Sequence, residues 1–98
     1  MANGVVIPYS DIKTKNVTLG SGSNSFTPTA VNWGAISTIA GVTGLKQNHI
    51  IAVTVMQAAL TPASNLIFGF YNDNLYIAAT QNCTMSGAMT LNITYHEP

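Results

Sequence analysis

The chain has 98 residues, the size of one domain that can bury a hydrophobic core without metals or disulfide bonds. Only 6% of its residues are charged, against about 25% in a typical soluble domain, and its formal net charge is zero. Nucleic-acid binding needs a cluster of cations, and a membrane-spanning helix needs about 20 apolar residues. Because the longest strongly apolar run, residues 50–60, is interrupted by Thr54 and Gln57, we expect neither nucleic-acid binding nor membrane insertion.

The polar surface must come mainly from uncharged side chains. Serine, threonine and asparagine fill 29 positions and arginine is absent. The charged residues are Lys13, Lys15, Lys46, Asp11, Asp73 and Glu97. Such a surface is poor at keeping a lone monomer soluble and free of contacts with other molecules. This favours a protein that packs against copies of itself. A soluble monomeric β-domain with an inert surface is the alternative.

The first fifteen residues differ from the rest of the chain. They contain one apolar patch, Val5-Val6-Ile7, followed by Pro8, and they lack the basic start and long apolar stretch of a secretory signal peptide. We predict that residues 1–15 form an N-terminal arm or an edge strand. Residues 16–98 are predicted to form one β-sandwich domain.

Alternation of apolar and polar residues continues along the remaining chain with a period of two, which is typical of strands. It is seen around Val17 and Leu19 and in residues 51–56, 66–71 and 89–95. Residues 35–40 are predicted to be a strand because Gly34 and Gly41 interrupt a helical spacing and Thr38 is β-branched. Asn72-Asp73-Asn74 predicts a tight hairpin, and residues 20–25, 61–65 and 82–87 are predicted to be loops.

Short strands separated by Gly, Asn and Pro turns predict an all-β fold, a small antiparallel β-sandwich with little or no helix. A jelly-roll-like arrangement and a partly open barrel are both compatible with the pattern. The predicted core is Ile51, Val53, Val55, Leu66, Phe68, Phe70, Leu91 and Ile93. Outward positions such as Thr54, Thr90 and Asn92 are expected to lie in an interface between subunits if the charge-poor surface is buried by assembly.

The residues that could carry chemistry are few and scattered. His49 and His96 have no metal-ligand spacing, and no motif links either of them to Cys83 as a base to a nucleophile. Cys83 is predicted to be a buried or half-buried thiol at a strand end. We therefore expect no enzyme, no catalytic residue, no metal and no cofactor.

One local cluster suggests ligand binding. Aromatic faces hold the C–H faces of sugars, and amide and carboxylate groups bond their hydroxyls. The candidate ligand-binding residues are Tyr71, Asn72, Asp73, Asn74, Tyr76 and Trp33. The alternative is that the tyrosines are cross-strand packing partners and the amides only form the turn.

The second half of the chain resembles a known kind of domain. Its segments read "IIAVTVMQ", "NLIFGFYNDNLYIAATQN" and "AMTLNITYHEP", and the earlier segment reads "NVTLGSGSNSFTPTA". Together, residues 16–96 resemble the small C-terminal β-sandwich domains of tailed-bacteriophage tail fibres and related minor virion structural proteins. The resemblance implies a trimer whose tip binds a host surface polysaccharide or protein. The resemblance includes no motif that assigns a catalytic or binding role to a particular residue of this chain.

The resemblance leads to three functional hypotheses. The first is a bacteriophage virion structural protein, a homotrimeric tail-fibre tip that presents loops for host attachment and receptor or glycan binding. Because a fibre protein carries a long shaft, this chain is then an excised tip domain or a separate small virion protein. The second hypothesis is a capsid decoration or head-fibre protein, and the third is a stand-alone carbohydrate-binding module. The expected partners are further copies of the chain, other virion proteins and the bacterial surface, and the expected location is the virion, assembled in the host cytoplasm.

Overall fold

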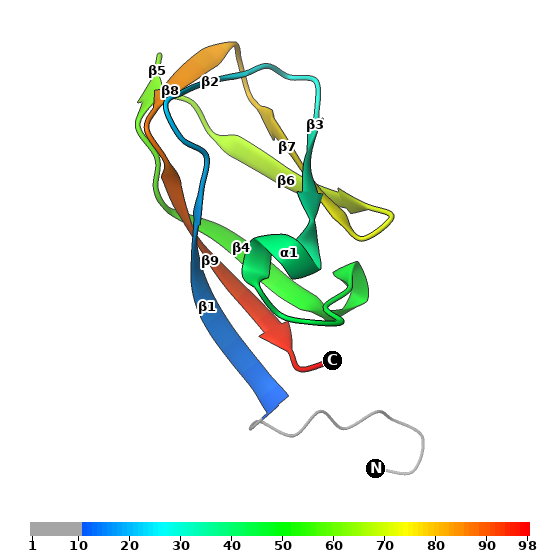
Figure 1. Cartoon of the computed structure of the whole chain (residues 1–98). Coiled ribbons are helices and arrows are strands. Elements are labelled where there is room, and N and C mark those ends of the chain that lie inside the picture. Colours follow the sequence, from blue (N-terminus) through cyan, green and yellow to red (C-terminus); the bar gives the residue numbers. More distant parts are fainter. Residues whose placement is uncertain (1–10) are drawn as a thin grey trace.

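A computed structural model describes residues 11–98, which form nine strands, one α-helix and one short 3-10 helix (Figure 1). The strands are β1 (Ile12–Leu19), β2 (Ser23–Phe26), β3 (Val31–Ala35), β4 (Ile50–Gln57), β5 (Leu60–Thr61), β6 (Leu66–Tyr71), β7 (Asn74–Ala79), β8 (Cys83–Ser86) and β9 (Met89–His96). The helices are α1 (Ile36–Ala40) and η2 (Gln47–His49). The prediction of a small all-β domain is confirmed. Within the described residues, no helix has the length and apolar character needed to cross a membrane.

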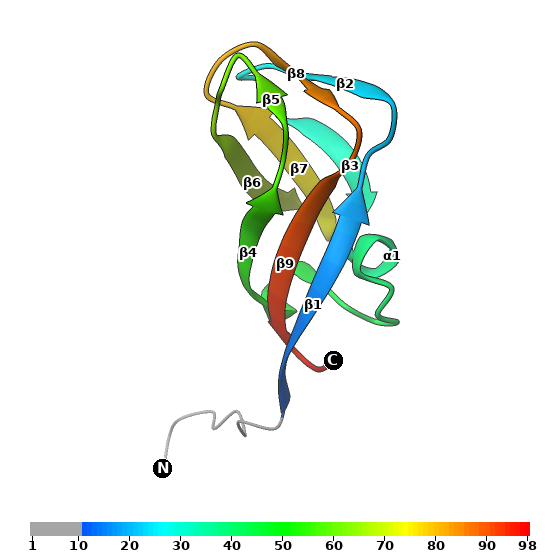
Figure 2. The ribbon, with the colours of Figure 1, turned by 90° about the vertical axis from the view of Figure 1, so that its left-hand side faces the viewer.

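The strands form three small antiparallel sheets, with the orders β1-β9-β4, β2-β8-β5 and β3-β7-β6. The first two sheets keep the same strand order because each strand of one continues along the chain into a strand of the other. They therefore form a long bent surface, and glycines make the bend. Gly22 and Gly87 both have positive φ, at 66° and 81°, and the Gly87 N–H donates to the Gly22 carbonyl. The β3-β7-β6 sheet faces this surface, so the fold is sandwich-like and does not close into a barrel (Figures 1 and 2).

The core lies between the facing sheets and under α1. Strand β9 is central in its sheet, and its odd-numbered residues are buried in strict alternation, as its sequence predicted. Leu91 and Ile93 are fully buried, which confirms two of the predicted core residues. One cluster comprises Phe26, Leu75, Ile77, Ala79, Cys83, Met85, Met89 and Leu91. A second cluster comprises Val17, Ile36, Ala40, Leu45, Ile93 and Tyr95.

The prediction of a strand over residues 35–40 is wrong, because the chain leaves β3 at Ala35 and forms α1. Ile36 and Ala40, four residues apart, are the buried face of this single helical turn. Gly41 ends it in the left-handed conformation, with φ 67°, and its N–H bonds the helix carbonyls. Of the two glycines that argued against a helix, Gly41 marks its end, and Gly34 lies in β3 just before it.

Two segments predicted to be loops contain most or all of a strand, and the third, residues 61–65, begins with the last residue of β5. Residues 20–25 include the start of β2, and residues 82–87 include β8, which pairs with β2 and β5. The β8 pattern is short but regular, because Cys83 and Met85 are buried and the residues between and after them are exposed. Cys83 is 4% exposed, which confirms the prediction of a buried thiol at a strand end.

The predicted arm or edge strand is described only in part. Residues 12–15 form the first half of β1, which is an edge strand of its sheet. Residues 1–10, including the Val5–Ile7 patch, lie outside the described part of the chain. The described domain therefore starts before residue 16, at the first residue of β1.

The predicted core is wrong for the two most apolar strands. Ile51 and Val55 are 52% and 40% exposed, and no residue of β4 or β6 is buried. The other four predicted core residues of these strands are half-buried and pack against the margins of the core clusters: Val53, Leu66, Phe68 and Phe70. The reason is topological, because β4 and β6 are edge strands of facing sheets and lie along the same side of the molecule (Figure 2).

Candidate functional site

The tyrosines of the predicted binding cluster lie on the outer face of the β3-β7-β6 sheet. Tyr71 ends β6 and Tyr76 lies in β7, and their ring centroids are 6.3 Å apart in an edge-to-face arrangement. Tyr71 is 65% exposed. Asn74 pairs with Tyr71 across the hairpin and therefore shares this face. The structure thus brings together three of the six predicted residues.

Two further residues join this face, and sequence reasoning missed them. Gly69 pairs with Tyr76 on one side, and Asn32 of β3 pairs with Tyr76 on the other. A Cβ atom built at Gly69 would meet nothing within 4 Å, so there is open space beside the tyrosines. Asn32 is exposed, and its Oδ1 accepts a hydrogen bond from the Gly34 N–H. Only the strand pairing reveals these neighbours. We call Asn32, Gly69, Tyr71, Asn74 and Tyr76 the tyrosine face.

Asn72 and Asp73 make the hairpin turn itself. Both have positive φ, 50° and 62°, which is the backbone that a two-residue type I′ turn requires. Asparagine and aspartate tolerate this conformation better than other non-glycine residues, so the sequence signal for the hairpin is confirmed.

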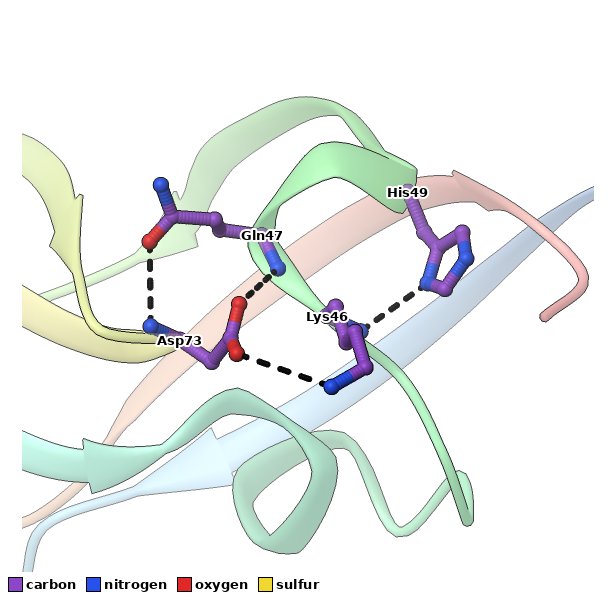
Figure 3. A network of polar contacts seen from close by, with 4 residues as sticks. All are labelled: Lys46, Gln47, His49 and Asp73. Atoms are coloured by element: carbon purple, nitrogen blue, oxygen red, sulfur yellow. Dashed lines mark hydrogen bonds and ion pairs between the residues drawn. The ribbon is translucent and has the colours of Figure 1, made fainter.

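Asp73 also fastens the turn to the segment before β4 (Figure 3). Its N–H donates to Gln47 Oε1 and its Oδ1 accepts from the Gln47 N–H, both at 3.0 Å. Its Oδ2 lies 4.0 Å from Lys46 Nζ, and its carbonyl accepts from the Ile36 N–H at 2.9 Å. The Asp73 carboxylate therefore holds the hairpin in place beneath the tyrosine face.

Trp33 lies apart from the tyrosines. Its ring stacks on Phe26, with centroids 5.6 Å apart and planes at 13°, and it packs against the core cluster. Trp33 lies at the register shift between Asn32 and Gly34 in the pairing of β3 with β7. Its contacts with Phe26 and the core place it away from the outer face. Trp33 is therefore a packing residue at the margin of the core and does not belong to the tyrosine face.

Groups for catalysis or metal binding are few in this part of the chain. Among residues 11–98 no three His, Cys, Asp or Glu side chains gather closely enough to hold a metal ion. His49 and His96 do meet, with ring centroids 5.1 Å apart and planes at 88°, because the start of β4 pairs with the end of β9. His49 Nδ1 accepts from the Lys46 N–H at 2.9 Å, so one ring nitrogen is used to shape η2.

The double hydrogen bond at Asp73 leads to a stability prediction. Asp73→Ala removes the acceptor of the Gln47 N–H and places alanine at positive φ, so it should lower the free energy of unfolding by about 1–2 kcal/mol. Asp73→Asn is the matched control, because it keeps an Oδ1 acceptor and tolerates the backbone. It loses only an exposed ion pair, so it should cost less than about 0.5 kcal/mol. Urea denaturation measures both, and equal losses in the two variants would contradict the hydrogen-bond explanation.

Comparison of the chain with protein-family models, curated proteins and solved structures finds no significant match.

Proposed function

We propose that this protein is a bacteriophage virion structural protein, a trimeric fibre-tip-like domain whose tyrosine face binds a glycan of the bacterial surface. The observation that carries the proposal is the exposed Tyr71, held edge-on to Tyr76 beside the open space at Gly69. Because Gly69 has no side chain, the C–H face of a sugar ring can approach the β6 backbone and contact the Tyr71 ring. Asn32 and Asn74 supply amide groups at the margins of the same face.

Two properties of the whole chain support this proposal. The surface is nearly free of charge, as expected for a subunit that is largely covered by copies of itself. The sequence of residues 16–96 also resembles the tip domains of tail fibres, which are small all-β domains like this one. The outward residues of the sheet form the tyrosine face, while the inward residues Leu75 and Ile77 of β7 hold the sheet on the core.

Tyr71→Ala tests the proposed binding face. We expect retention of fluorescently labelled protein on bacteria that the parent virion infects to fall about 10- to 100-fold, the usual loss when a central aromatic contact is truncated. The melting temperature should stay almost unchanged because the side chain is mostly exposed. Val31→Ala is the matched control, since it truncates an exposed apolar side chain on the other edge strand of the same sheet and should not alter retention.

Three outcomes separate the functional hypotheses. Retention on cells that depends on Tyr71, together with a trimer by sedimentation, supports the fibre-tip proposal. The same retention by a monomer favours a stand-alone carbohydrate-binding module. Absence of retention on every susceptible strain, together with binding to capsids lacking the protein, favours a capsid decoration protein.

A further inference from the structure

One side of the sandwich is covered and the other is not. Helix α1 packs against β1 and β3 and closes the side where these two edge strands lie (Figure 2). On the opposite side, β4 and β6 border two open hollows of about 220 and 400 Å³. The first hollow lies between Val53 of β4 and Phe68 and Phe70 of β6, and the second lies between Val55 and Leu66. We call the side formed by β4 and β6 the open side.

The open side exposes a large apolar area. Four large apolar side chains on its two strands, apart from Tyr71 of the tyrosine face, are 40–58% exposed: Ile51, Val55, Met56 and Ile67. If each offers roughly 200 Å² when fully exposed, they present on the order of 400 Å² together. The half-buried side chains of the hollows and the two strand backbones add to this area. The four exposed side chains alone supply about half of the ~800 Å² per partner that a stable protein interface buries.

The edge strands also differ in how they are protected against pairing. Edge strand β1 carries Lys13 and Lys15, and charged side chains on an edge discourage the addition of another strand. Edge strand β3 has a register shift between Asn32 and Gly34 and is flanked by α1. By contrast, β4 and β6 carry no charged residue and no proline along their eight and six residues. Strand β4 is irregular at both ends of its pairing with β9, but it is regular from Ala52 to Val55.

We propose that the open side is the contact between copies of this chain, in which β4 of one copy pairs edge to edge with β6 of the next. The two strands run in opposite directions along the open side (Figure 1), so the pairing would be antiparallel, like every ladder in residues 11–98. Thr54 and Gly69 face outward near the middle of the two strands, where small residues let the backbones approach. The inward residues Val53 and Val55 then meet Phe68 and Phe70 across the junction.

This arrangement explains why both unprotected edges occur on one side. Because both edges lie on the same side, this pairing closes either as a two-fold dimer, in which each β4 meets the partner's β6, or as a larger ring of copies. In either closed assembly every β4 has a β6 partner, so neither of these two edges stays exposed. The inference rests on the proposed function only for the number of copies, which is three, and the pairing of β4 with β6 stands independently of any receptor.

Paired cysteines test which edges meet. The double variants combine Thr54→Cys with one of Ile67→Cys, Gly69→Cys or Tyr71→Cys, the successive outward positions of β6. Within one copy these positions belong to different sheets and point away from each other, so a disulfide must join two copies. Under mild oxidation we expect one of the three variants to form covalent multimers that end at the trimer. The wild-type chain, whose Cys83 is buried, is the oxidation control.

The cysteine results are decisive in each direction. Covalent dimers from Thr54→Cys alone would overturn the proposal, because they require β4 to meet β4. Failure of all three double variants to cross-link would also overturn it. Multimers that end at the dimer would support the edge pairing and overturn the trimer of the proposed function.

A charge placed on the open side gives a second test. Val55 faces the larger hollow, and in the free chain a lysine at this position can still reach water. In the assembly the ammonium group would be desolvated without a partner, so Val55→Lys should weaken association at least about 100-fold, measured by sedimentation. Val31→Lys is the matched control, because it introduces the same change at a similarly exposed valine on the covered side. Equal sedimentation of the two variants, or a wild-type chain that is monomeric at about 100 μM, would overturn the proposal.

Discussion

Leu75→Ala is expected to lower the free energy of unfolding by about 3–5 kcal/mol, a large part of the stability of a domain of this size. Leu75 is fully buried in β7, the central strand of its sheet, and packs within the larger core cluster. Its truncation leaves a cavity that the surrounding sheet residues cannot fill. The measurement is urea denaturation in the Val55→Lys background, so that association between copies does not contribute.

Ile51→Ala is the matched control for this prediction. Its side chain is 52% exposed although the sequence pattern placed it in the core, so its truncation should cost less than about 1 kcal/mol in the same background. Phe68→Ala should fall between the two, because its ring is half-buried at the margin of the core. If Ile51→Ala were as destabilising as Leu75→Ala, β4 would not be the exposed edge that the structure describes.

Val55→Lys is expected to reduce the retention of labelled protein on bacterial cells by about 10²–10⁴-fold, while its circular dichroism spectrum stays that of the wild type. Each tyrosine face offers few contacts, so a single copy should bind weakly. Three linked copies that engage a repetitive surface together gain avidity of this size, and a monomer loses it. Retention of the wild type should change little as salt rises to about 0.5 M, because screening acts on charges that this chain hardly has.

Two controls separate loss of assembly from loss of the binding face. Val31→Lys should be retained like the wild type, since it adds the same charge without reaching the open side. Tyr71→Ala should remain a trimer but lose retention, because it alters the tyrosine face and leaves the hollows intact. Full retention of the monomeric Val55→Lys variant would show that a single copy suffices and would remove the need for avidity.

The candidate site was only partly predictable from the sequence. The hairpin at Asn72 and Asp73 was evident because few residues other than glycine tolerate its positive φ, and Tyr71 and Tyr76 follow from their places beside it. Trp33 was grouped with them wrongly, because aromatic character does not reveal which face of a strand a side chain occupies. Asn32 and Gly69 were missed because they reach the tyrosine face only through pairing between strands distant in the chain.

The sequence by itself determined the all-β class, the alternation of β9 and, for residues 11–98, the absence of a long helix, because these depend on local spacing and turn residues. Only the tertiary structure decided which apolar strands are buried. A run such as residues 50–56 has the same composition whether it lies at the centre or at the edge of a sheet, and strand order depends on contacts between distant residues. That order places β7 and β9 at the centres of their sheets. A strand pairs on each side of them, and their alternate side chains are buried. The same order places β4 and β6 at edges, so their apolar side chains stay exposed until another strand covers them.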